Sequence, residues 1–172
     1  QEGGRLSGLV EGGEGGFDTV ALNGTYNEVF YTITGPQSGI LGLDGNNLDF
    51  AGMEPITVQN PGAVLTVNGT SPDSGFTTGG DDDLVVRQNT DPDYTDFVMV
   101  IDPGGGGEKL FFNNPSTSLI LSGEGGTDAV TIESFDSGFN ADLSIEAETI
   151  FVDPGAAIQT GGNVTFTALA EN

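Results

Sequence analysis

The sequence contains no cysteine, no histidine and no tryptophan. Disulfides, zinc sites built from cysteine and histidine, and histidine-based catalysis are therefore excluded. Basic residues are scarce as well: three of them stand against 26 acidic residues, which gives a formal net charge of −23. A chain with this charge repels nucleic acids and anionic membrane surfaces, and it attracts cations, divalent ions most strongly.

Long apolar runs are also missing. A membrane-spanning helix needs about 18 consecutive apolar residues or more, and no stretch approaches that length, so we expect no membrane insertion. The basic residues are Arg5, Arg87 and Lys109, and no catalytic constellation is recognisable, so we do not expect an enzyme. The chain starts at Gln1 without a visible signal peptide, and we expect either a processed chain or a fragment of a longer one.

The composition predicts an all-β protein, because 29 glycines accompany many β-branched residues and no segment has a helical period. Short apolar runs recur roughly every ten residues between Gly, Pro, Asn and Asp turns. Residues 1–172 fit a single β-rich domain or one segment of a longer array. We predict about fifteen strands, at 19–22, 28–34, 39–43, 48–50, 55–58, 63–67, 84–87, 97–101, 109–112, 118–121, 129–132, 143–145, 149–152, 156–158 and 163–168. The run 97–101 is the most apolar, and we expect it to be buried on both faces.

Two architectures are compatible with regular short strands, and the C-terminal third favours one of them. Leu143 and Ile145 form an apolar-polar-apolar triplet, and Val164 and Phe166 form another further along the chain, with glycine-rich corners between the two. A coil of roughly 21 residues, stacked on the next at about 4.8 Å, is typical of a β-solenoid, the parallel β-helix. We therefore expect a β-solenoid, with a β-sandwich or jelly roll as the alternative.

One segment occurs twice, because residues 8–22 are similar to residues 118–132. Both copies contain Gly-Glu-Gly-Gly-x-Asp-x-Val, which aligns Glu14 with Glu124 and Asp18 with Asp128. Each copy is a short apolar run, a glycine-rich acidic turn and an alternating segment. This pattern is typical of a β-chain that turns a corner, where glycine supplies positive φ angles.

Acidic turns are candidate calcium sites, because calcium takes about six to eight oxygen ligands from carboxylates and backbone carbonyls. The predicted ligands lie in two turn pairs, one acidic run and one further pair: Glu14 and Asp18, Glu124 and Asp128, Asp81, Asp82 and Asp83, and Asp91 and Asp93. The alternative is that these acidic turns keep the surface solvated and the strand edges free of aggregation.

The segment 143–168 resembles the coils of giant secreted bacterial adhesins of the filamentous-haemagglutinin and autotransporter type. Residues 50–58 (Phe-Ala-Gly-Met-Glu-Pro-Ile-Thr-Val) and 108–115 (Glu-Lys-Leu-Phe-Phe-Asn-Asn-Pro) look like repeats of very large surface proteins of aquatic bacteria, often described as haemolysin-like or calcium-binding. The repeated turn is similar to the calcium-binding nonapeptide of RTX proteins. However, the two copies are separated by more than half of the chain, whereas RTX sites share ions between adjacent turns. The resemblance implies an extracellular β-helix with an adhesive or structural role and no enzyme.

These observations lead us to expect an extracellular module of a bacterial cell-surface protein, or a filament subunit that stacks head to tail. Its partner would be a neighbouring repeat or a second copy, because a solenoid end presents unpaired strand edges. Calcium would help assembly by neutralising charge. The alternative is a calcium-dependent carbohydrate-binding β-sandwich that recognises surface glycans.

Overall fold

The computed structural model describes residues 8–13, 15–69, 81–104 and 107–170. Within these ranges the chain forms fifteen β-strands, one 3₁₀ turn (η1, Pro92–Tyr94) and no α-helix. The strands are β1 (Gly8–Glu11), β2 (Val20–Leu22), β3 (Glu28–Gly35), β4 (Ser38–Leu43), β5 (Asn46–Ala51), β6 (Ile56–Val58), β7 (Val64–Asn68), β8 (Asp83–Gln88), β9 (Met99–Pro103), β10 (Leu110–Phe112), β11 (Ser118–Ser122), β12 (Ala129–Ser134), β13 (Asp142–Ala147), β14 (Thr149–Val152) and β15 (Val164–Ala168). The fold is therefore all-β, as the composition predicts.

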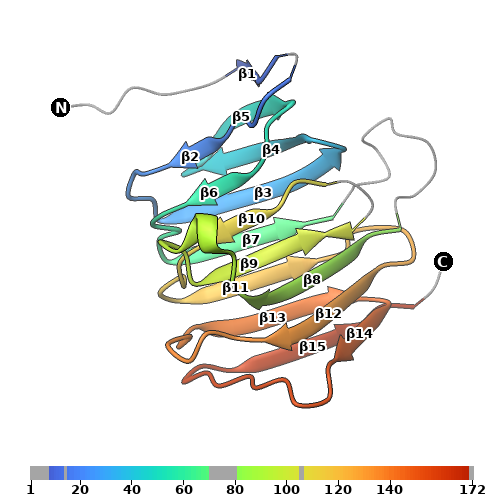
Figure 1. The fold of residues 1–172 in the computed structure, drawn as a ribbon. Helices are drawn as coiled ribbons and strands as arrows, with labels where there is room; N and C mark the ends of the chain where they lie inside the picture. The colour runs from blue at the N-terminus through green and yellow to red at the C-terminus, as the bar shows by residue number, and fades with distance from the viewer. Residues whose placement is uncertain (1–7, 14, 70–80, 105–106, 171–172) are drawn as a thin grey trace.

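The strands form two mixed sheets. Sheet A has eight strands in the order β1-β5-β4-β3-β7-β11-β13-β15, and sheet B has seven in the order β14-β12-β8-β9-β10-β6-β2. Figure 1 shows the strands stacked from β1 at the upper end to β15 at the lower end. Only β4 in sheet A and β9 in sheet B run antiparallel to their neighbours.

The chain passes back and forth between the sheets, with two exceptions. Three consecutive strands, β3 to β5, form a meander in sheet A, and β8 to β10 form a meander in sheet B. Elsewhere each strand of one sheet is followed by a strand of the other. Consequently, parallel neighbours in sheet A are unequally spaced along the chain. Val29, Leu65, Leu119, Leu143 and Val164 pair in turn, and the spacing is longest from Leu65 to Leu119 and shortest from Leu143 to Val164.

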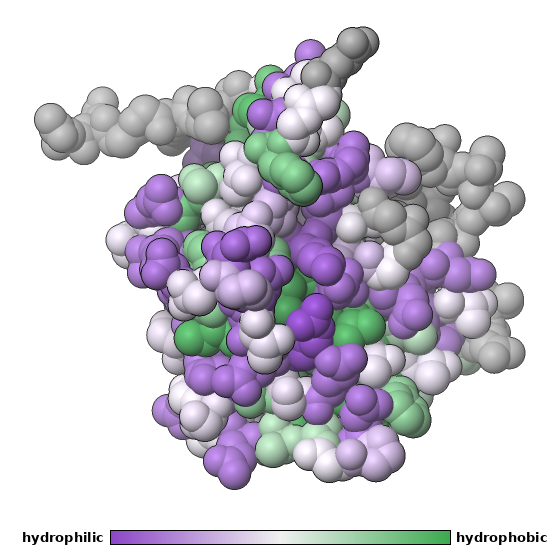
Figure 2. All heavy atoms as spheres, in the orientation of Figure 1, coloured by the Kyte–Doolittle hydropathy of each residue, from purple (hydrophilic) through white to green (hydrophobic). Residues whose placement is uncertain are grey.

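The alternating sequence of the strands produces a single core between the sheets. Val29, Leu65, Leu119 and Leu143 are at most 1% exposed and form one inward row of sheet A. The second inward row is Tyr31, Val67, Leu121, Ile145 and Phe166. Sheet B contributes similar pairs, such as Leu84 and Val86 on β8. Figure 2 shows that hydrophilic residues dominate the visible outer surface, with hydrophobic residues between them.

Several strand predictions can be compared directly with the structure. The predicted pairing of the triplets at 143–145 and 164–166 is confirmed, since Leu143 pairs with Val164 and Ile145 with Phe166. Burial of the most apolar run on both faces is confirmed at positions 99–101. The predicted strand at 156–158 is wrong, because this segment has no strand conformation and follows a turn at 154–155.

The lower end of the stack has uncovered apolar side chains. Both inward rows of sheet A continue into β15, yet Val164 is 44% exposed and Phe166 is 43% exposed. In sheet B, Phe151 and Val152 on β14 are 50% and 41% exposed. β14 and β15 are edge strands, so their outer backbone groups have no ladder partner in the described part of the chain.

Candidate functional site: a column of carboxylates beside sheet B

An acidic residue precedes every strand of sheet B that runs in the common direction, two positions before an apolar residue that pairs with its neighbours. The core residues Val20, Ile56 and Leu110 pair in one set, and Leu84, Val130 and Ile150 pair in another. Two positions before each of them lies a carboxylate: Asp18, Glu54, Glu108, Asp82, Asp128 and Glu148. Within each set the strands are in register, and across β9 the two sets are offset by two residues, because Leu110 and Val86 both pair with Ile101. The six acids precede their strands on one side of the sheet, and we call them the carboxylate column.

The antiparallel strand β9 divides this column into two groups. The upper group is Asp18, Glu54 and Glu108, before β2, β6 and β10. The lower group is Asp82, Asp128 and Glu148, before β8, β12 and β14.

Hydrogen bonds between strands connect the lower group. The backbone N–H of Asp82 donates to Oδ1 of Asp128 at 2.9 Å, and the N–H of Asp128 donates to Oε2 of Glu148 at 2.9 Å. The N–H of Thr127 donates to Oδ1 of the adjacent Asp81 at 3.0 Å. These carboxylates therefore satisfy backbone donors at the corners, where the strand ladder has ended.

Asp128 is the most buried member of the column. It is 1% exposed, and its Oδ2 is buried without a hydrogen-bond partner among the described residues. Burial raises the pKa of Asp128 from 3.8 to about 6. The hydrogen bond from the N–H of Asp82 lowers this pKa, whereas the negative charges of Asp82, Glu148 and Asp81 raise it. A buried carboxylate oxygen without a donor favours a proton or a cation beside it.

A glycine at the preceding corner makes room for three of these acids. Gly12, Gly69 and Gly123 each follow directly on a strand of sheet A. A Cβ atom would lie 2.5 Å from Oδ2 of Asp82 at Gly69 and 2.5 Å from Oδ2 of Asp128 at Gly123. At Gly12 it would lie 2.9 Å from Cβ of Asp18 and closer still to the carbonyl oxygen of Gly52. The same Gly–Asp corner therefore occurs three times, with connections of different length.

This geometry corrects the sequence alignment of the two repeated segments. Both copies do connect a strand of sheet A to a strand of sheet B, as the corner interpretation predicts. However, the glycine that approaches the aspartate is Gly12 in the first copy and Gly123 in the second, although the sequence motif aligns Gly13 with Gly123. The first turn is one residue longer.

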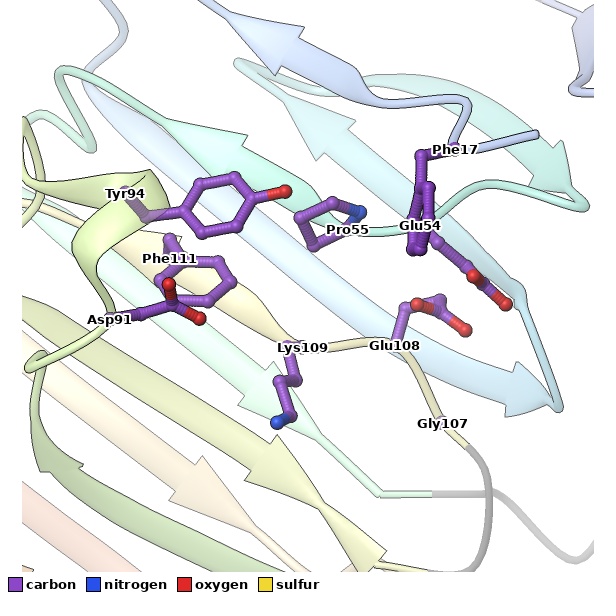
Figure 3. Close-up of a pocket in the computed structure, with 9 residues that line it drawn as sticks. All are labelled: Phe17, Glu54, Pro55, Asp91, Tyr94, Gly107, Glu108, Lys109 and Phe111. Carbon is purple, nitrogen blue, oxygen red and sulfur yellow. The ribbon is translucent and has the colours of Figure 1, made fainter.

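The upper group borders a pocket of about 300 Å³. Figure 3 shows the residues that line it. The apolar wall consists of Phe17, Pro55, Tyr94 and Phe111, the carboxylates are Glu54, Glu108 and Asp91, and Gly107 and Lys109 complete the lining. The rings of Tyr94 and Phe111 are stacked at a centroid distance of 4.1 Å. Phe17 lies on the opposite side and is 87% exposed.

Glu108 is the buried acid of this pocket. Burial raises the pKa of Glu108 from 4.5 to about 7, and the neighbouring Glu54 raises it further, while Lys109 lowers it. Within the described residues, the side chains of Glu54 and Glu108 accept no hydrogen bond and form no salt bridge. Tyr31 donates its hydroxyl to the backbone carbonyl of Glu108 at 3.2 Å, which fixes the backbone beneath the pocket.

The structure brings together three of the predicted calcium ligands. Asp82 and Asp128 come from two different predicted groups and are adjacent in the column, with Asp81 beside them. Asp18 lies in the upper group. Sequence reasoning missed Glu54, Glu108 and Glu148, although each stands two positions before an apolar strand residue, and that spacing is the signal that could have found them.

The other predicted ligands that the structure describes do not belong to the column. Asp83 is an exposed residue at the start of β8, and Glu124 is exposed in the turn with a φ of 70°. Asp91 caps η1 by accepting a hydrogen bond from the N–H of Asp93 at 3.0 Å. Glu14 lies outside the described residues. In the described ranges, no group of three or more acidic side chains converges in a way that could hold a metal ion as it stands.

Comparison with protein-family models, curated proteins and solved structures gives no match for this chain. Neither these comparisons nor the described side chains point to an enzymatic activity. In the part of the chain that is described, no helix has the length and apolar character needed to cross a bilayer.

Proposed function

We propose that the chain is a structural or adhesive module of an extracellular bacterial surface protein, folded as a β-solenoid and stacked end to end with further coils. The observation that carries this proposal is the lower end of the stack. The inward rows of sheet A are at most 1% exposed in their four preceding rungs and then about half exposed at Val164 and Phe166. Another coil placed on β14 and β15 would bury these side chains and pair both open edges.

Strand direction supports the same arrangement. β15 and β1, at opposite ends of sheet A, run the same way, and so do β14 and β2 in sheet B. A second copy placed head to tail would therefore continue both sheets with parallel pairing. The added coil would come either from the next repeat of a longer chain or from such a copy, and repeated heterologous contacts of this kind produce a fibre.

An internal duplication tests the solenoid. Residues 143–163 span one repeat of the register between β13 and β15. A chain in which this segment is duplicated should keep one cooperative unfolding transition and unfold at a higher urea concentration, because the added coil extends the buried rows by second copies of Leu143 and Ile145. A β-sandwich has no place for such an insertion, so loss of cooperative unfolding would refute the solenoid.

Light scattering across a concentration series tests stacking between copies. We expect particle mass to increase with concentration, and replacement of both Val164 and Phe166 by Asn should abolish the increase. The control replaces the outward-facing Thr165 and Thr167 on the same strand by Asn. A protein that stays monomeric at all concentrations would exclude the filament and leave the neighbouring repeat of a longer chain as the partner.

We also propose that calcium stabilises the stack at the lower group of the column. The observation that favours this is the unpartnered, buried Oδ2 of Asp128 beside Asp82 and Glu148. Since these carboxylates do not converge, backbone carbonyls and water would supply most of the ligands. We expect calcium to raise the melting temperature relative to EDTA in the unaltered protein and not in the Asp128→Asn variant. Equal melting temperatures with calcium and EDTA would refute this part of the proposal.

A further inference from the structure

The pocket beside the upper group has an unbalanced negative charge. Glu54, Glu108 and Asp91 all line it, and none of the three forms a salt bridge within the described residues. The one basic residue in its lining, Lys109, directs its ammonium group away from Glu54 and Glu108, as Figure 3 shows. Its Nζ lies 3.1 Å from Oδ2 of Asp102.

No other basic side chain in the described part of the protein neutralises these carboxylates. Besides Lys109, this part contains only Arg87, which lies 3.6 Å from Asp102 and 3.7 Å from Glu133. Both basic side chains are thus engaged outside the pocket. Carboxylates that are partly withdrawn from water and have no internal counter-charge attract an external cation.

The walls of the pocket indicate what kind of cation fits. The described carboxylates of the pocket do not converge as a ligand set for a bare metal ion, and they include no buried unpartnered oxygen of the kind found at Oδ2 of Asp128. Instead, the carboxylates lie beside Tyr94, Pro55 and the exposed ring of Phe17. Aromatic faces and apolar surface beside negative charge favour an organic cation, through cation–π attraction and burial of its hydrocarbon part.

Phe17 supports this interpretation independently. Its ring is 87% exposed. In the second copy of the repeated segment, Thr127 occupies the position that Phe17 has in the first copy. A large apolar side chain held in water gains free energy when a ligand covers it. The volume of about 300 Å³ is at the lower limit for small-molecule sites, and it suits a charged group on a stem of a few carbons.

From these features we infer that the pocket binds an ammonium or guanidinium group carried on a short apolar stem, with Glu54 and Glu108 facing the charge and Phe17 and Tyr94 enclosing the stem. The group could be part of a free amine or of a lysine or arginine side chain of a peptide. The raised pKa of Glu108 is consistent with a site that lacks its counter-ion. The titratable groups around this carboxylate are Glu54, Lys109, Asp91, Tyr31 and Tyr94.

Calorimetric titration of the full chain tests this inference. The probes are n-butylammonium and n-butylguanidinium, with n-butanol as the neutral probe of the same length. Two capped tripeptides, acetyl-Gly-Lys-Gly-amide and acetyl-Gly-Arg-Gly-amide, distinguish a peptide source from a free amine. We expect both cations to bind at least about tenfold more tightly than butanol.

Variants locate the site. Glu54→Gln and Glu108→Gln should each weaken binding of the cations by about tenfold, and Phe17→Thr, which introduces the residue of the second copy, by about threefold. Asp49→Asn is the control, because Asp49 is exposed on β5 outside the pocket, and it should change affinity by less than about twofold. Glu54 is only half-buried, so its variant remains informative if Glu108→Gln fails to fold.

Three results would overturn the inference. Butanol binding as tightly as the cations would show that charge is not recognised. If Asp49→Asn and Glu54→Gln weakened binding of the cations equally, the cations would be attracted only by the overall negative charge of the protein and not by the pocket. Binding of cellotriose together with no binding of the cations would assign the pocket to a neutral sugar.

Discussion

In the lower group of the carboxylate column, Asp128 and Glu148 accept backbone N–H groups from neighbouring strands, whereas in the upper group the side chains of Glu54 and Glu108 accept none from the described residues. Both groups stand two positions before a paired apolar residue, and the two sets of strands are offset by two residues across β9. They differ in their surroundings: the lower acids lie among successive corners, whereas Glu54 and Glu108 of the upper group line an open pocket with aromatic rings. Strand register therefore decides where an acid lies, and the neighbouring side chains decide whether it closes a corner or remains available to a ligand.

The largest expected contrast concerns the two repeated segments, one at the upper end of the stack and one inside it. Leu119 is fully buried on β11, while its sequence counterpart Leu9 is 59% exposed on β1. Leu119→Ala should lower the free energy of unfolding by about 3 kcal/mol, because it leaves a cavity. Leu9→Ala should change it by less than about 0.5 kcal/mol. Urea denaturation measures both, and similar losses would mean that β1 is packed as tightly as β11.

A second contrast compares glycines that the sequence motif aligns. Gly123→Ala would place a Cβ 2.5 Å from Asp128, whereas Gly13 has no atom within 4 Å of such a Cβ and needs glycine only for its φ of 87°. We expect losses of about 2–3 kcal/mol for Gly123→Ala and about 1 kcal/mol for Gly13→Ala. An equal loss in the two variants would contradict the Gly–Asp corner.

The third contrast uses pH to examine the upper group. The pKa of Glu108 is raised from 4.5 to about 7 in the folded protein. As pH increases from 4.5 to 7, the unfolded chain releases this proton before the folded one, so the folded state loses stability over that window. Glu108→Gln removes the effect. It should stabilise the protein by about 1 kcal/mol at pH 8, discounted for the open pocket, and by almost nothing at pH 4.

Stability curves at several pH values check this third prediction. Glu133→Gln serves as a control for a single removed charge, because Glu133 lies outside the pocket and pairs with Arg87. If Glu108→Gln and the unaltered protein differ equally at pH 4 and pH 8, the acid does not titrate in the pocket as described.

The smallest expected effect is that of Phe17→Thr on stability. Since the ring is 87% exposed, the substitution should change the free energy of unfolding by less than about 0.5 kcal/mol. Affinity for organic cations should nevertheless fall. A large loss of stability would mean that Phe17 supports the first corner rather than the pocket.

The strands could be predicted from the sequence because each has its own alternation and its own turn residues. The pairing of Leu143 with Val164 was also predictable, since only a short stretch of chain with one strand of sheet B lies between them. In contrast, Leu65 and Leu119 pair across a much longer stretch that includes a meander and a long connection. A search for a constant spacing does not find such a pair, because the inserted strands change the length without changing the register.

The candidate site was less accessible to sequence reasoning for the same cause. Clusters of neighbouring acids, such as Asp81 to Asp83, attract attention in a sequence, yet only Asp82 belongs to the column. Glu54 and Glu108 are far apart in the sequence, and their proximity depends on the pairing of β6 with β10. Local charge density indicates an acidic surface, whereas the register of distant strands selects the acids that meet.

The two meanders have a geometric consequence for the length of the molecule. Each adds two strands to its own sheet beyond strict alternation, one in sheet A and the other in sheet B. The additions cancel, so β14 and β15 finish level at the lower end (Figure 1). Since adjacent strands are about 4.8 Å apart, a chain with a single meander would have one sheet longer than the other by about 10 Å at its end. A further coil could not pair with both sheets across such a step. A lineage that lengthens or shortens such a protein would have to gain or lose both meanders together, while complete coils could be added one at a time.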